Sequence, residues 1–173
     1  MTVARELAEF LTEVSTSDLP AQTMDHAAMV IASTFASAAF GTTIESAQIV
    51  RDLTQEQGGR PDSSIWFDTG AKLPVAQVAR VNAMLSDAAA SDDSDLRNIV
   101  HAGTPLTAVS LAMAERVGAS GEDVLDAIVI GYEIAGRLSE PISPGFRNRG
   151  FHGCLGAATV SYTHLTLPTK RIV

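Results

Sequence analysis

Cysteine is nearly absent from this chain of 173 residues, since Cys154 is the single one. One cysteine can form neither an intrachain disulfide framework nor a cysteine-based zinc site. The sequence also lacks a His-x-x-x-His pair, a Walker loop, a Gly-x-Gly-x-x-Gly motif and a Gly-x-Ser-x-Gly motif. We therefore expect no metal site, no nucleotide-binding loop of these types and no hydrolase nucleophile elbow.

Basic residues, aromatic residues and long hydrophobic runs are also scarce. The chain has 12 Lys and Arg against 20 Asp and Glu, a net charge of −8, and only 5% aromatic residues. This balance argues against a nucleic-acid surface, which needs clustered Lys and Arg. The longest weakly polar stretch, 27–41, is shorter than the ~20 apolar residues of a membrane span, and the start is unlike a signal peptide. We expect a cytoplasmic protein without nucleic-acid or membrane partners.

What the sequence does contain is helical periodicity, with 46% hydrophobic residues available for a core. The spacing predicts an all-α fold with helices over residues 3–14, 20–40, 44–57, 75–89, 105–117 and 120–138. The β-prone segment 63–67 and the turn at 68–70 allow at most one short β-hairpin near 63–70. The second helix is apolar nearly all round from Ala27, so we expect it at the centre of the fold, with Gly41 as its C-cap.

A first polar loop, residues 91–103, is a candidate site for acid/base chemistry. It places Asp92, Asp93 and Asp95 within four positions and His101 shortly after them. Mutual repulsion raises the pKa of at least some of these carboxyl groups unless cations compensate. Histidine exchanges protons near neutral pH. The alternative is an acidic, solvated loop in which Asp92 or Ser94 merely caps a neighbouring element.

A second polar loop, residues 144–153, carries Arg147, Arg149 and His152 among glycines. Arginine binds carboxylates through planar, bidentate donors, and glycines let a ligand approach the backbone closely. The alternative here is a flexible basic loop. By this chemistry Arg97, Arg147 and Arg149 are candidates for binding a carboxylate group.

The last fourteen residues, 160–173, differ from the rest because they contain no acidic residue and no alanine. Residues 160–169 resemble the translated adaptor sequence that contaminates some metagenomic assemblies. We therefore expect a native fragment over residues 1–159 and a non-native tail over 160–173. The alternative is a native strand and basic tail.

The two polar loops and three further elements together resemble the MmgE/PrpD proteins, the family of 2-methylcitrate dehydratase and cis-aconitate decarboxylase. The resemblance covers residues 3–159. It rests on the order and spacing of several elements: Ile31–Gly41, Ala79–Leu85, Asp92-Asp93-Ser94 followed by His101-Ala102-Gly103, Gly131-Tyr132-Glu133-Ile134 with Arg137-Leu138, and Gly150-Phe151-His152.

The resemblance implies the N-terminal part of the family's large helical domain, with a smaller α/β lid and catalytic lysines beyond this chain. It implies a cofactor-independent lyase or isomerase, most of all a hydro-lyase, that acts on small di- or tricarboxylates. The shared chemistry is proton transfer at a carbon beside a carboxylate. The full-length protein is expected to form a homodimer, and the fragment alone is expected to be inactive.

The resemblance also implies roles for individual residues. His101 is the candidate acid/base, and His152 would assist it or bind substrate. Ser94 takes the place of a substrate-binding threonine, and Asp92 is the best candidate for a catalytic aspartate. Ala90 stands where family members often carry an aspartate, which indicates a divergent subgroup with another substrate.

A different class of function is a non-catalytic helical interaction or dimerisation module. It would explain the missing aspartate and the missing C-terminal half. Under either function, we expect the fragment to expose apolar patches and to self-associate. Binding of citrate-like acids by the complete protein would distinguish the enzyme from this module.

Overall fold

The computed structural model describes residues 5, 6, 9, 17, 19–70, 72–96 and 100–139. Five helices have defined bounds: α2 (Ala21–Gly41), α3 (Glu45–Gln57), α4 (Val75–Ala88), α5 (Gly103–Val117) and α6 (Gly121–Ser139). No strand occurs in these residues, so the predicted all-α class is confirmed. The expected second polar loop and the expected tail lie outside the described residues.

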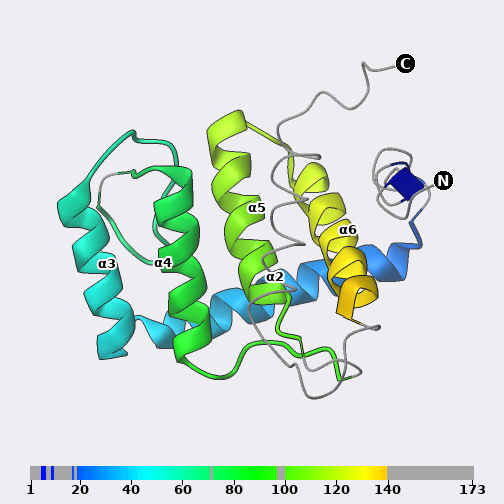
Figure 1. Cartoon of the computed structure of the whole chain (residues 1–173), viewed down its shortest axis with the longest axis horizontal. Coiled ribbons are helices and arrows are strands. Elements are labelled where there is room, and N and C mark those ends of the chain that lie inside the picture. Colours follow the sequence, from blue (N-terminus) through cyan, green and yellow to red (C-terminus); the bar gives the residue numbers. More distant parts are fainter. Residues whose placement is uncertain are drawn as a thin grey trace.

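The helices form a row that is crossed by one long helix. α3, α4, α5 and α6 stand side by side in this order, and α2 runs across the row (Figure 1). α2 packs chiefly on α4 and also touches α5 and α6. The loop from α4 to α5 therefore emerges next to α2.

Two buried clusters make up the core, and α5 contributes to both. In one cluster, Leu106 and Met113 pack with Val124 and Ile128 of α6. In the other cluster, residues of α4 pack against the segment before it, with Ala108 and Ala112 of α5. Since α5 is shared, the two halves of the row are held to each other through this helix.

The ends of the helices largely follow the sequence signals. Gly118 ends α5 in the left-handed conformation, with a φ of 70°. The backbone N–H of Ser120 donates to Asp123 Oδ2 at 2.9 Å, and the N–H of Asp123 donates to Ser120 Oγ at 3.1 Å. This reciprocal pair is the predicted capping box at the start of α6.

The predicted role of Gly41 as a C-cap is wrong. Gly41 is the last residue of α2, and Thr42 is the C-cap. A Cβ atom on Gly41 would lie 1.7 Å from the carbonyl oxygen of Leu85 in α4. The glycine is therefore required by the close approach of two helix backbones rather than by a turn.

The β-prone segment forms one isolated bridge. Ser63 pairs with Leu73 in antiparallel fashion, with backbone N···O distances of 3.0 and 2.8 Å. Asn82 of α4 holds the chain between these residues, because its Oδ1 accepts from the N–H of Trp66 at 3.0 Å. The expected hairpin is thus reduced to a single pair of residues.

The expected central burial of α2 is correct for one side of the helix only. Met29 is 66% exposed and Phe40 is 64% exposed. Ala32 and Ala36 lie exposed between them, and no charged residue occurs from Ala27 to Gly41. The row of helices covers one side of α2, and we call the uncovered side, Met29, Ala32, Ala36 and Phe40, the outer face of α2.

No single helix in the described part of the chain is long and apolar enough to cross a membrane. α2 and α3 pass that test only as a pair, and a bend of 92° separates them.

Candidate active site

The site is built on the loop that joins α4 to α5. An isolated antiparallel bridge closes this loop, in which the N–H of Asp95 donates to the carbonyl oxygen of Val100 at 2.9 Å. The bridge folds the chain back on itself. As a result, the residues just before Asp95 lie beside those just after Val100.

This arrangement brings two of the predicted catalytic residues together. His101 Nδ1 lies 3.2 Å from Asp92 Oδ2, with the two side chains 22% and 4% exposed. The contact has the distance of an ion pair, while the angle is not that of a hydrogen bond, so Nδ1 has no hydrogen-bond partner within the described residues. Thr104 Oγ1 donates to the same carboxylate oxygen at 3.2 Å. The Asp92 carboxylate thus contacts both His101 of the loop and Thr104 of α5.

Asp93, the next residue of the loop, contacts the first residue of α5. Its Oδ2 accepts from the backbone N–H of Gly103 at 3.2 Å. Its Oδ1 is buried and finds no hydrogen-bond partner in the described ranges. Burial raises the pKa of the Asp93 carboxyl above its ordinary 3.8, and the charge of Asp92 raises it further, against the lowering by the Gly103 N–H and His101.

The expected pKa increase is therefore confirmed for Asp93, although repulsion is not its main cause. Removal from water disfavours the charged form more than the neighbouring carboxylate does. The alternative of an acidic, solvated loop is wrong for Asp92, whose side chain is almost fully buried. The capping role belongs to Asp93, which accepts from the start of α5.

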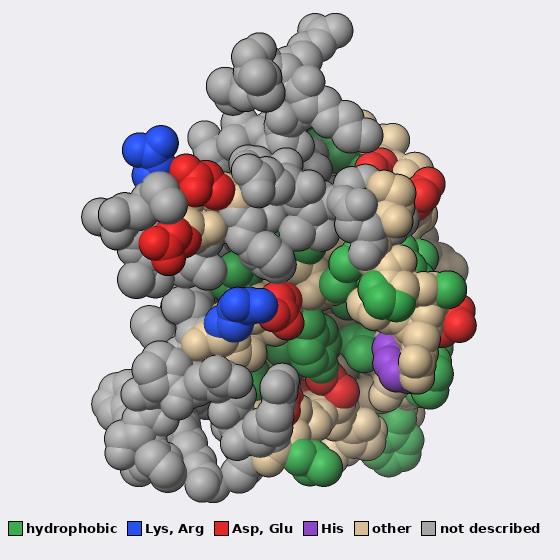
Figure 2. Space-filling view, turned by 90° about the vertical axis from the view of Figure 1, so that its right-hand side faces the viewer, with side chains coloured by type: hydrophobic (Ala, Val, Ile, Leu, Met, Phe, Trp, Pro, Cys, Tyr) green, Lys and Arg blue, Asp and Glu red, His purple; other side chains and the backbone are tan. Residues whose placement is uncertain are grey.

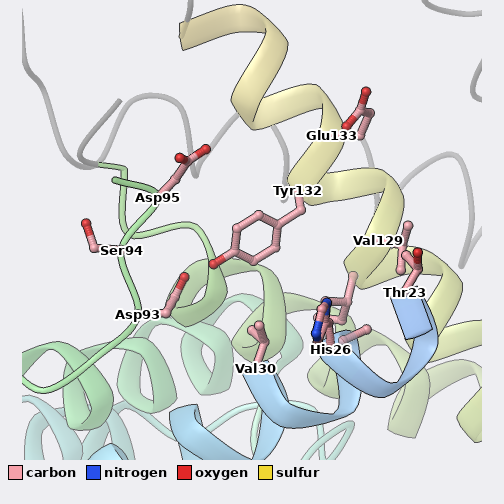
Figure 3. Close-up of a pocket in the computed structure, with 11 residues that line it drawn as sticks. Thr23, His26, Val30, Asp93, Ser94, Asp95, Val129, Tyr132 and Glu133 are labelled. Carbon is pink, nitrogen blue, oxygen red and sulfur yellow. The ribbon is translucent and has the colours of Figure 1, made fainter. Parts of the chain in front are cut away.

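A pocket of about 440 Å³ opens beside this loop, between α2 and α6. Figure 3 shows Tyr132 reaching from α6 toward the side of Asp93, with His26 below it on α2. Figure 2 faces α6 and the start of α2, and it shows hydrophobic side chains around a hollow with acidic side chains at its floor. The polar and charged groups of its wall include His26, Asp93, Ser94, Asp95, Tyr132 and Glu133.

The charge of this pocket is negative. Asp93, Asp95 and Glu133 contribute carboxyl groups, and no Lys or Arg lines the described part of the wall. Glu133 is paired with Arg137, whose Nε lies 2.6 Å from its Oε1. Strong binding of a carboxylate in this pocket would therefore require cations from elsewhere in the protein.

The predicted site residues divide into two groups. Asp92 and His101 are in contact, and Ser94 is exposed at the pocket wall. Arg97, Arg147, Arg149 and His152 lie outside the described residues, and their roles stay predictions. The residues that line the pocket come from α2, from α6 and from the loop between α4 and α5 (Figure 3).

Three residues of the site were missed by the sequence reasoning. Tyr132 and Glu133 line the pocket, and they stand in the Gly-Tyr-Glu element that carries part of the resemblance. Thr104 contacts Asp92 and directly follows the element His101-Ala102-Gly103. All three residues lie within or directly beside elements that carry the family resemblance, and this position in the sequence could have identified them.

Comparison with known families decides the family. The sequence model of the MmgE/PrpD N-terminal domain matches residues 5–173. The chain belongs to the MmgE/PrpD family. The family suggested by the sequence elements is thereby confirmed, and it is one that includes dehydratases and other lyases.

No curated protein and no solved structure gives a significant match to the chain. In this MmgE/PrpD domain, the elements Asp92-Asp93-Ser94 and His101-Ala102-Gly103 meet at the start of α5. Tyr132 and Glu133 of the Gly-Tyr-Glu element line the same pocket as Asp93 and Ser94. Three of the elements that carry the resemblance therefore converge on one place.

Proposed function

We propose that the protein is part of an acid/base catalyst, a lyase or isomerase that transfers a proton at a carbon beside a carboxylate of a small di- or tricarboxylate. The single observation that supports this most is the contact between His101 and Asp92, in the loop whose next residues, Asp93 and Ser94, line the pocket. A histidine placed against a carboxylate is a common arrangement for a general base. No cofactor or metal is part of the proposal.

In this proposal His101 transfers the proton, and Asp92 orients the imidazole ring of His101. The Asp92 side chain is almost fully buried and already accepts a hydrogen bond from the hydroxyl of Thr104. It is therefore better placed to orient the imidazole than to contact substrate. An ionised carboxylate beside Nδ1 favours a proton on that nitrogen. The lone pair of Nε2 is then free to accept the proton that leaves carbon.

Binding of the anionic substrate requires positive charge that the described pocket wall does not supply. We assign this role to Arg97, Arg147 and Arg149, and a supporting role to His152, on their chemistry alone. Positive charge near the reacting carbon would also stabilise the enolate-like intermediate.

The experiment uses the full-length protein and a panel of citrate-like acids in D2O. Proton NMR follows the exchange of the C–H hydrogen beside the carboxylate, and formation of an unsaturated or decarboxylated product. We expect His101→Gln to lower the rate by orders of magnitude, since general acid/base catalysis contributes about 10²- to 10⁴-fold. Arg116→Gln, an exposed change at the far end of α5, is the matched control.

An unchanged exchange rate in His101→Gln would remove His101 from the catalytic role. If the wild-type protein binds these acids saturably but catalyses no C–H exchange, the enzyme hypothesis is rejected and the protein is a binding protein.

A second candidate function is an interaction or dimerisation module, and the outer face of α2 favours it. This face exposes Met29 and Phe40 and carries no charge over residues 27–41. Uncharged, exposed apolar surface of this kind marks sites of association. For the enzyme, we propose that the full-length protein forms a homodimer. Self-association without any response to carboxylic acids would favour the interaction module instead.

A further inference from the structure

We propose that Thr104 is a positioning residue. Its hydroxyl fixes the Asp92 carboxylate so that His101 carries its proton on Nδ1 and presents Nε2. The effect on turnover rests on the function proposed above. The effect on the imidazole can be measured without any substrate.

One carboxylate oxygen is shared by the two groups. Asp92 Oδ2 lies 3.2 Å from Thr104 Oγ1 and 3.2 Å from His101 Nδ1. Thr104 is the second residue of α5 and is almost fully buried. Because it sits on a helix, Thr104 gives the loop carboxylate a fixed point of attachment.

The direction of the hydrogen bonds around Thr104 follows from the chemistry of its neighbours. An ionised carboxylate only accepts, so Thr104 must donate its one hydroxyl proton to Asp92. Ser86 Oγ lies 3.0 Å from Thr104 Oγ1 and is fully buried on α4. Ser86 must therefore donate to Thr104, and both hydroxyl dipoles point toward the carboxylate. Hydrogen bonds aligned in this way strengthen one another.

The residue behind this chain is itself held in place. Ser37 of α2 donates to the backbone carbonyl oxygen of Ser86 at 2.8 Å. Ser91 Oγ lies 2.9 Å from Ser37 Oγ, and it must be the donor because the proton of Ser37 is already used. α2, α4 and α5 thus all help to fix the position of Asp92.

The arrangement has a consequence for the imidazole of His101. A carboxylate with a fixed position and a retained charge selects the tautomer with the proton on the nearer ring nitrogen. If the hydroxyl of Thr104 is lost, Asp92 can rotate away from Nδ1, and its selection of the tautomer weakens. Thr104 then acts on the reaction through two other residues, without touching substrate.

The test compares Thr104→Val with Thr107→Val, in the full-length protein. Valine keeps the shape of threonine and removes the hydroxyl. Thr107 lies one turn further along α5, is fully buried, and its hydroxyl has no hydrogen-bond partner among the described residues, so it is a matched control. Thr104→Ser keeps a hydroxyl at the site and is the rescue variant.

Two readouts are measured for each variant: the tautomer of His101 by ¹⁵N NMR of the ring nitrogens, and kcat and KM separately. We expect the Nδ1–H tautomer in wild type, Thr107→Val and Thr104→Ser. We expect Thr104→Val to lose that preference, with kcat lower by about 10- to 100-fold, the equivalent of one hydrogen bond to a charged group, and with KM little changed.

The inference is overturned if Thr104→Val keeps the wild-type tautomer, or if Thr107→Val shows the same losses. If Thr104→Val does not fold, as judged by circular dichroism, Ser86→Ala replaces it, and a wild-type tautomer there overturns the inference as well. If the protein acts on none of the acids, the proposed function fails, while the tautomer still decides the role of Thr104.

Discussion

A side-chain oxygen of Asp93 caps the first turn of α5 by accepting a hydrogen bond from the backbone N–H of Gly103 at 3.2 Å. A carboxylate at this place also interacts favourably with the positive end of the helix dipole. The side chain of Asp93 occupies the space in which a side chain at position 103 would stand. Glycine at 103 is therefore a condition for the loop to close on the helix.

Gly103→Ala is expected to destabilise the protein. The new Cβ would lie 2.3 Å from Asp93 Oδ1 and 2.7 Å from Val30 Cγ1, so both neighbours would have to move. Overpacking of this kind costs about 1–3 kcal/mol in the free energy of unfolding, measured by urea denaturation. Gly121→Ala is the control, because a Cβ at the first residue of α6 meets nothing within 4 Å. Equal unfolding midpoints for the two variants would contradict the prediction.

Asp93→Asn is expected to change how stability depends on pH. The folded-state pKa of Asp93 is raised, so the folded state holds its proton more firmly than the unfolded state does. The stability linked to this group is present below the unfolded pKa and is lost as pH rises through the folded pKa. Asparagine keeps an acceptor for the Gly103 N–H and cannot ionise.

The thermal unfolding of Asp93→Asn and wild type should therefore diverge as pH rises from about 3 to neutrality, with the variant gaining relative to wild type. A difference in Tm that stays constant over this range would show that burial of the Asp93 charge carries no cost.

Asn82→Ala is expected to loosen the segment before α4. Asn82 is fully buried, and its amide accepts from the N–H of Trp66 and donates to the carbonyl oxygen of Ser64. Leaving these backbone groups unpaired costs about 1–3 kcal/mol. Fluorescence of Trp66, the single tryptophan, should shift to the red as water reaches it. Gln55→Ala removes an exposed side-chain hydrogen bond and should leave both readouts near wild type.

Phe40→Ser is expected to weaken self-association through the outer face of α2. Phe40 is 64% exposed, so its replacement should leave folding intact while removing apolar surface from the contact. Light scattering coupled to size-exclusion chromatography measures the mass as a function of concentration. Leu96→Ser is the control, because Leu96 is 90% exposed and lies on the site loop. A wild-type protein that is monomeric at every concentration would reject this interface.

Helices α2 to α6 were predictable from the sequence because their apolar periodicity and end signals agree. Gly118 and the pair Ser120–Asp123 mark ends that need only local geometry. The role of Gly41 was predicted wrongly because the sequence does not distinguish a glycine that caps a helix from one that allows two helices to pack closely. The start of α5 was set two residues late at Pro105, since the N–H of Gly103 is satisfied by a residue ten positions earlier.

The burial of α2 shows a different limit. An apolar composition on every side predicts that a helix avoids water, but it does not say how many sides the remaining helices can cover. Met29 and Phe40 lie on the side that the row of helices leaves open.

The candidate site was predicted only as a set of residue types. The resemblance identified His101 and Asp92 as candidates. Their contact depends on the bridge between Asp95 and Val100, and no sequence motif predicts that bridge. The contact of Thr104 with Ser86 depends on how α5 packs on α4. Such contacts arise from tertiary packing, and a single sequence carries no direct record of it.

The bridge at Asp95 and Val100 makes the candidate acid/base pair a local feature of the chain. Positions 92 and 101 are joined through a short loop, and closing a short loop loses little chain entropy. Contacts between nearby residues also form early when a chain folds. The contact between His101 and Asp92 is therefore expected to form early in folding, before contacts with distant segments. Substrate specificity would then depend on side chains from those distant segments.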